Sequence, residues 1–102
     1  MKVVINRRFG GFGVSKEAYD FMGLEWDGYG YLIKYEEEKY GEFAPNKLRT
    51  DPKLVECVET LGILANGRCA DLKVVEIPDN IEWYISDYDG IETIEEKHRS
   101  WC

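Results

Sequence analysis

A chain of 102 residues has the usual size of one folding unit, and this length supports one hydrophobic core but not two. Hydrophobic residues make up 44% and aromatic residues 14%, which excludes a disordered acidic chain. The formal net charge of −7 disfavours binding to duplex nucleic acid, because that binding depends on Lys and Arg side chains that neutralise phosphates. We therefore expect a single folded domain over residues 1–102.

The sequence contains neither a recognisable targeting segment nor a recognisable cysteine motif. The N-terminus has no apolar run long enough for a secretory signal, and no stretch is long enough to span a bilayer, so we expect a cytoplasmic protein without membrane contact. Cys57, Cys69 and Cys102 form no C-x-x-C pair and have no neighbouring His. We expect reduced thiols, with Cys57 in the core, and neither a metal nor another cofactor.

The N-terminal third begins with a strand and a short helix. Lys2–Asn6 contains three consecutive apolar residues, which predicts a strand covered on both faces. The glycines of residues 10–13 then break any regular pattern. Ser15 is a good N-cap for a helix over Lys16–Met22, and Gly23 is a natural end for it.

The middle of the chain combines strand, turn and connection. Tyr29–Tyr35 is rich in aromatic residues and predicts a strand. Residues 36–50 follow as an exposed connection. Asp51 as N-cap and Pro52 at the first helical position then open a helix over Pro52–Asn66. Gly62 lies inside this helix, where we expect it to permit close packing.

The C-terminal third predicts three more strands. Leu72–Ile77 is apolar, and residues 81–85 alternate between apolar and polar side chains. The dipeptide Asp89-Gly90 is a hairpin signal, so Ile91–Glu96 is predicted as the returning strand, with a helix as the open alternative. Together these elements predict an α+β fold, with one mixed or antiparallel sheet of about four to five strands against two helices.

Three parts of the chain carry distinctive blocks: the start (Lys2–Arg7 and Gly10–Ser15), a middle block (Asp51–Glu56, Ala65–Arg68 and Leu72–Asp79) and the close (Glu82-Trp83, Tyr88–Gly90, Glu96–Arg99 and Trp101). Together these blocks resemble small uncharacterised proteins encoded by tailed phages and prophages. Residues 24–50 match nothing in that family. The resemblance implies a phage-encoded accessory protein, and small phage proteins of this sort often act against host defence systems.

Basic and aromatic side chains gather at the two ends of the sequence and form the first candidate site. Two interpretations remain open for the glycine-rich segment: a tight turn, or an anion or nucleotide site to which arginines contribute. The C-terminal basic residues are interpreted either as a solvated tail or as a partner contact. The candidate residues for ligand or partner binding are Arg7, Arg8, Gly10, Gly11, His98, Arg99 and Trp101.

Acidic side chains form the second candidate surface. They are interpreted as a solvated face or as a mimic of nucleic-acid phosphates, and their spacing does not fit a calcium loop. The candidate partner-facing acids are Glu36, Glu37, Glu38, Glu92, Glu95 and Glu96. The aromatic residues Trp26, Tyr29, Tyr31, Tyr40 and Trp101 are interpreted either as interface anchors or as core residues, with about half of them expected in the core.

No catalytic constellation is recognisable in the sequence, so we expect a non-enzymatic binding protein. Our first hypothesis is that it modulates a host process by occupying a host protein, for example a CRISPR effector. The alternative is a binder of a nucleotide or another phosphate-bearing signal, and an enzyme acting on nucleotides ranks third. The sequence leaves the oligomeric state open.

Overall fold

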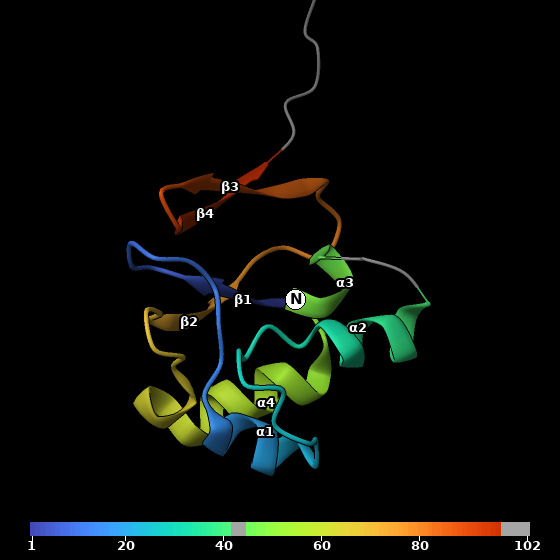
Figure 1. Ribbon diagram of the computed structural model, residues 1–102. Helices are drawn as coiled ribbons and strands as arrows, with labels where there is room; N and C mark the ends of the chain where they lie inside the picture. The colour runs from blue at the N-terminus through green and yellow to red at the C-terminus, as the bar shows by residue number, and fades with distance from the viewer. Residues whose placement is uncertain (42–44, 97–102) are drawn as a thin grey trace, which may run out of the picture.

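Four strands form two separate antiparallel sheets in the computed structural model, which describes residues 1–41 and 45–96 (Figure 1). β1 (Lys2–Asn6) pairs with β2 (Leu72–Glu76), and β3 (Trp83–Tyr88) pairs with β4 (Ile91–Glu96). The predicted α+β class is confirmed, but in place of one sheet the described chain has two.

The two sheets meet through side chains where a single sheet would have a backbone ladder. The backbone N–H of Asn6, at the end of β1, donates to Glu92 Oε1 of β4 over 2.8 Å. Arg7 Nη1 donates to the backbone carbonyl of Glu92 over 2.8 Å. The Glu92 carboxylate, and not a backbone carbonyl of β4, accepts the Asn6 N–H. No backbone ladder therefore joins β1 to β4 at this point, and the single sheet that the sequence predicts does not form.

Helices α1 (Lys16–Met22) and α4 (Pro52–Leu61) begin where the sequence predicts. The Ser15 hydroxyl accepts the N–H of Ala18, and Gly23 ends α1 with φ of 72°. Asp51 Oδ1 accepts the N–H groups of Lys53 and Leu54 at the start of α4. Both N-caps are thus confirmed, because a short polar side chain satisfies amides that lack an intrahelical partner.

The predicted end of the second helix is wrong. α4 ends at Leu61 and a 3-10 helix, η1 (Gly62–Ala65), continues the chain. Gly62 has φ of 57° and ψ of −127°, and a Cβ added there would meet no atom within 4 Å. Gly62 therefore serves to break α4 by its backbone conformation and does not permit close packing.

The predicted strand over Tyr29–Tyr35 is also wrong, because this segment leads into a helix. Leu32 has φ of 59° and is buried, and it starts α2 (Ile33–Tyr40). A further short helix, α3 (Pro45–Arg49), precedes α4. The segment expected to be an exposed connection is thus helical in most of its described length.

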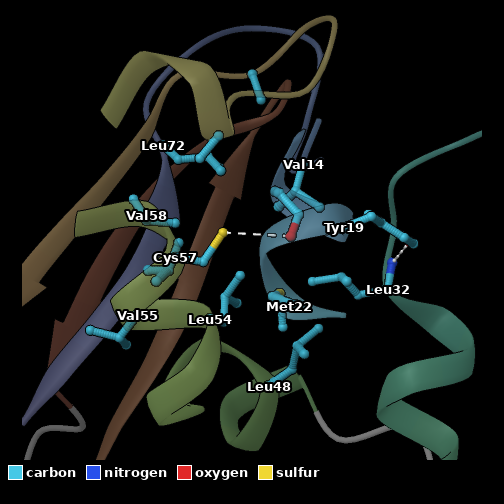
Figure 2. Close-up of a cluster of buried hydrophobic side chains, with 14 residues drawn as sticks. Val14, Tyr19, Met22, Leu32, Leu48, Leu54, Val55, Cys57, Val58 and Leu72 are labelled. Carbon is cyan, nitrogen blue, oxygen red and sulfur yellow. Dashed lines mark hydrogen bonds between the residues drawn. The ribbon is translucent and has the colours of Figure 1, made fainter. Parts of the chain in front are cut away.

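The core lies between the β1–β2 sheet and helices α1 and α4 (Figures 1 and 2). Val3, Val4 and Ile5 are all buried, because helices cover one face of this sheet and the β3–β4 hairpin lies over the other. This confirms the prediction of a strand covered on both faces. Cys57 is fully buried, as expected, and its thiol points to the Ala18 carbonyl (Figure 2).

The C-terminal hairpin has the predicted turn. Asp89 and Gly90 have φ of 50° and 94°, the positive angles that a two-residue turn of this type requires. Asp87 Oδ1 accepts the N–H of Gly90 over 2.8 Å. Ile91–Glu96 is a strand, so the helical alternative is wrong. No helix in the described ranges is both long and apolar enough to cross a membrane.

Candidate ligand-binding cleft

A cleft of about 540 Å³ lies between three loops that are distant in the sequence. Its floor is the glycine-rich loop, residues 10–13, which joins β1 to α1. One wall is the segment between α1 and α2, and the other is the segment between η1 and β2. The lining residues from the two walls are Trp26, Gly28, Tyr29 and Tyr31 on the first and Asn66, Gly67, Arg68 and Cys69 on the second.

Glycines allow the three loops to approach this closely. Gly67 donates its N–H to the Gly13 carbonyl over 3.0 Å, and Val14 donates to the Gly30 carbonyl over 2.9 Å. A Cβ on Gly67 would lie 2.6 Å from the Gly13 carbonyl carbon, and one on Gly30 would lie 2.2 Å from the Val14 carbonyl oxygen. Both contacts are too short for any other residue type, so the cleft depends on glycine at these two positions.

Asp27 holds the aromatic wall in place. Its Oδ1 accepts the N–H groups of Tyr29 and Gly30, and its Oδ2 accepts the Tyr19 hydroxyl over 2.9 Å. Desolvation opposes ionisation of Asp27, but the N–H groups of Gly30 and Tyr29 and the Tyr19 hydroxyl hold its pKa below the usual value. The Tyr19 hydroxyl also accepts the N–H of Leu32 (Figure 2), so the wall is tied to the start of α2.

Three aromatic side chains of this wall are open to solvent. Trp26 is 37% exposed, Tyr29 77% and Tyr31 52%. The rings of Tyr29 and Tyr31 are nearly parallel, with an interplanar angle of 7° and centroids 6.3 Å apart. Trp26 rests edge-on against Tyr19, with centroids 5.0 Å apart. The wall therefore presents flat apolar faces that are suited to a planar ligand.

Positive charge dominates the cleft although the whole chain is acidic. Lys16 and Arg68 line it, both are exposed, and neither pairs with a carboxylate among the described residues. No Asp or Glu from the described ranges lines the cleft. Two unpaired cations beside aromatic rings form an arrangement that favours an anionic ligand.

The predicted basic site is only partly assembled. Gly10 and Gly11 line the cleft as expected. Arg7 lies elsewhere, in a second, mainly apolar hollow of about 390 Å³ between the two sheets. The Arg8 side chain is exposed and does not line the cleft. The remaining predicted residues, His98, Arg99 and Trp101, lie outside the described part of the chain.

The predicted acidic surface requires a correction at two of its six positions. Glu36 and Glu92 are buried, with exposed fractions of 2% and 4%, so they do not face a partner. Glu92 is buried because both of its oxygens bind the Arg49 guanidinium, at 2.5 and 2.8 Å. Glu37, Glu38, Glu95 and Glu96 are exposed.

A cluster of polar side chains around Asp51 links two helices. Lys39 Nζ and the Tyr40 hydroxyl donate to Asp51 Oδ2 over 2.5 and 2.6 Å, and the Tyr35 hydroxyl lies 3.1 Å from both oxygens. Burial of Asp51 opposes ionisation, but Lys39, Tyr40 and the N–H of Leu54 hold its pKa below the usual value. Every Asp51 oxygen thus binds groups of α2 or α4, and the cluster joins these two helices.

Comparison with family models, with curated proteins and with solved structures finds no match. In the described ranges, no group of three or more His, Cys, Asp or Glu side chains is placed to hold a metal ion. The sequence pointed to the glycine-rich loop and to the three aromatic residues. It did not single out Lys16 and Arg68, because only the fold brings these isolated bases to the same hollow.

Proposed function

We propose that the chain is a non-enzymatic binding protein whose cleft takes a nucleotide-type ligand, a planar ring that carries phosphate. The observation that carries this proposal is the lining of the cleft: exposed aromatic rings and two unpaired cations in a protein of net charge −7. A cleft of about 540 Å³ falls within the range of small-molecule sites, roughly 300 to 1,000 Å³.

The two kinds of lining residue suit the two parts of such a ligand. Tyr29 and Tyr31 offer ring faces for stacking of a base, a contact worth about 1–3 kcal/mol in nucleic-acid complexes. Arg68 and Lys16 offer donors for phosphate oxygens, and hydrogen bonds to charged groups contribute about 1.5–3 kcal/mol. Both kinds of side chain are exposed in the cleft and are therefore accessible to a ligand.

The lining favours binding over catalysis. Cys69 is the strongest nucleophile beside the cleft, but no His, Asp or Glu of the described ranges lines the cleft to act as its general base. We therefore place ligand capture ahead of an enzyme acting on nucleotides.

We also place ligand capture ahead of the host-protein hypothesis that the sequence favoured. That hypothesis drew on six acids, of which Glu36 and Glu92 are buried. The resemblance to phage proteins supports a context in which the captured molecule is a phosphate-bearing signal of the host.

The test is a thermal melting screen of the full chain against AMP, the cyclic nucleotides, adenosine and inorganic phosphate. We expect a nucleotide that carries both ring and phosphate to raise the melting temperature more than adenosine or phosphate alone. Saturation at one hundred times the dissociation constant stabilises the folded chain by about 2.7 kcal/mol.

Variants separate the cleft from general charge effects. Arg68→Ala and Tyr29→Ala are expected to weaken nucleotide binding at least tenfold. Arg8→Ala removes the same charge from an exposed side chain outside the cleft, and it should leave binding unchanged. The proposal is wrong if no nucleotide at millimolar concentration shifts the melting temperature, or if Arg8→Ala weakens binding as much as Arg68→Ala.

A further inference from the structure

The outer edge of β3 is open in the described part of the chain. β3 pairs with β4 on one side, and no other described strand pairs with it (Figure 1). Tyr88 and Ile91 flank a two-residue turn and form the hydrogen-bonded pair that closes it. Because hydrogen-bonding direction alternates along a strand, the backbone groups of Trp83, Ile85 and Asp87 point to the open edge.

The side chains beside this edge are aromatic and acidic. Tyr84 is 45% exposed and Tyr88 74%, and the period of two places them on the same face of β3. Residues 74–96 contain eight acids and neither Lys nor Arg. Among these acids, Glu82, Asp87, Asp89, Glu95 and Glu96 are exposed on or next to the hairpin.

This charge disfavours a second copy of the chain as the partner. Edge-to-edge pairing of two copies would bring Glu82 and Asp87 of one copy close to the acids of the other, and like charges on neighbouring strands are destabilising. Many proteins protect an open edge with lysine, proline or a bulge. An acidic edge prevents self-pairing but attracts a strand of opposite charge.

We propose that β3 accepts an extended segment of another protein, rich in Lys and Arg, as the third strand of the hairpin sheet. Main-chain hydrogen bonds to Trp83, Ile85 and Asp87 would hold the segment, and its cations would lie beside Glu82 and Asp87. Addition of a strand to an open edge is an established way for a domain to bind a peptide. A two-stranded sheet also gains stability from a third strand.

The probe is a capped eight-residue peptide of alternating Lys and Val, added to the full chain and followed by calorimetry and by amide hydrogen exchange. We expect binding that weakens as salt is added, and at least tenfold slower exchange of the Ile85 and Asp87 amides when the peptide is bound. The same peptide with alternate amides methylated keeps its charge but loses its donors, and it should bind at least tenfold more weakly.

The matched variants separate the edge from the overall charge. Glu82→Lys should weaken binding at least tenfold. Glu17→Lys makes the same change of charge on the exposed side of α1 and should have little effect. The proposal is wrong if the methylated peptide binds equally well, if the α1 variant loses as much affinity, or if light scattering shows that the peptide-free chain dimerises through this edge. Arg68→Ala leaves the edge intact and should bind the peptide as tightly as the parent chain does, so failure of the nucleotide proposal would leave this one standing.

Discussion

Within residues 1–41 and 45–96, Asp51 is the residue whose side chain makes the most hydrogen bonds. It caps α4, and its carboxylate also accepts hydrogen bonds from Lys39, Tyr35 and Tyr40. Asn is as good an N-cap as Asp but carries no charge, so Asp51→Asn isolates the ion pair. We expect this variant to unfold with a free energy about 2 kcal/mol lower at pH 7, because it loses hydrogen bonds to a charged group.

The pH dependence of this difference follows from the lowered pKa of Asp51. A carboxyl group whose pKa is lower in the folded state than in the unfolded state stabilises the fold above its ordinary pKa, about 3.9. That contribution is lost as the pH falls through the folded-state pKa. Urea unfolding should therefore show the full difference between parent and Asp51→Asn at pH 5 to 7 and a shrinking difference below about pH 4. A difference that stays constant down to pH 2 would show that the charge of Asp51 contributes nothing.

The cysteines Cys57 and Cys69 should differ sharply in reactivity. Burial raises the pKa of the Cys57 thiol to about 11, whereas Cys69 is exposed beside the cleft. Since the thiolate is the reactive form, we expect iodoacetamide at pH 8 to alkylate Cys69 at least about a hundredfold faster than Cys57. Peptide mass spectrometry measures each site, and in guanidinium the two rates should become equal. Equal rates in the native protein would contradict the buried position of Cys57.

At the scale of elements, the pair Arg49 and Glu92 joins α3 to β4. The side chains are 10% and 5% exposed, and the Arg49 guanidinium also lies 3.7 Å from the Phe12 ring centroid. Glu92→Gln leaves the guanidinium buried without a counter-charge, which costs about 3–5 kcal/mol. Urea denaturation should show this loss, and Arg49→Met added to Glu92→Gln should restore part of it.

The exposed pair Lys2 and Glu59 supplies the control for this prediction. Its side chains are 47% and 44% exposed and solvent screens the pair, so Glu59→Gln should leave the midpoint of urea denaturation almost unchanged. A double variant of Arg49 and Glu92 that is less stable than Glu92→Gln alone would show that no buried unpaired charge is responsible.

The elements that could be predicted from the sequence are those with local signals. Ser15, Asp51 and the Asp89-Gly90 turn each act on backbone groups within a few residues, so their effect is visible in the sequence. α2 is not predicted because aromatic residues around its start favour a strand, whereas in the structure the Tyr35 and Tyr40 hydroxyls bind Asp51, the N-cap of α4. Arg49 and Glu92 are 43 positions apart in the sequence, so no pattern among neighbouring residues could predict that they pair.

The same contrast applies to the candidate sites. The glycine-rich loop is a local feature, and its glycines do line the cleft. Arg7 is close to this loop in the sequence, but its side chain donates to the Glu92 carbonyl of β4 and lines the hollow between the two sheets. Lys16 and Arg68 join the cleft because hydrogen bonds such as Gly67 N–H to the Gly13 carbonyl and Ser15 N–H to the Ala65 carbonyl hold their two segments together.

At the scale of the whole molecule, the glycine-rich loop connects the cleft to the hairpin. Gly10 donates its N–H to the Asp89 carbonyl over 3.1 Å, and a Cβ on Gly90 would lie 2.3 Å from the Gly11 nitrogen. Because Gly10 and Gly11 also line the cleft, Gly90→Ala should push the loop and the hairpin apart and alter a site that Gly90 does not line. We expect it to weaken AMP binding about tenfold, measured by calorimetry on the folded fraction.

Gly23→Ala separates this effect from simple backbone strain. Gly23 also has a positive φ, 72°, but a Cβ there would meet no atom within 4 Å, so the variant is strained without displacing a neighbour. It should lose about 1 kcal/mol of stability and keep its affinity for AMP. Coupling between two sites is reciprocal, so bound AMP should in turn slow amide exchange at Asp89 to Ile91. If Gly90→Ala binds AMP as tightly as Gly23→Ala does, the cleft and the hairpin act independently, and each surface must then be understood by itself.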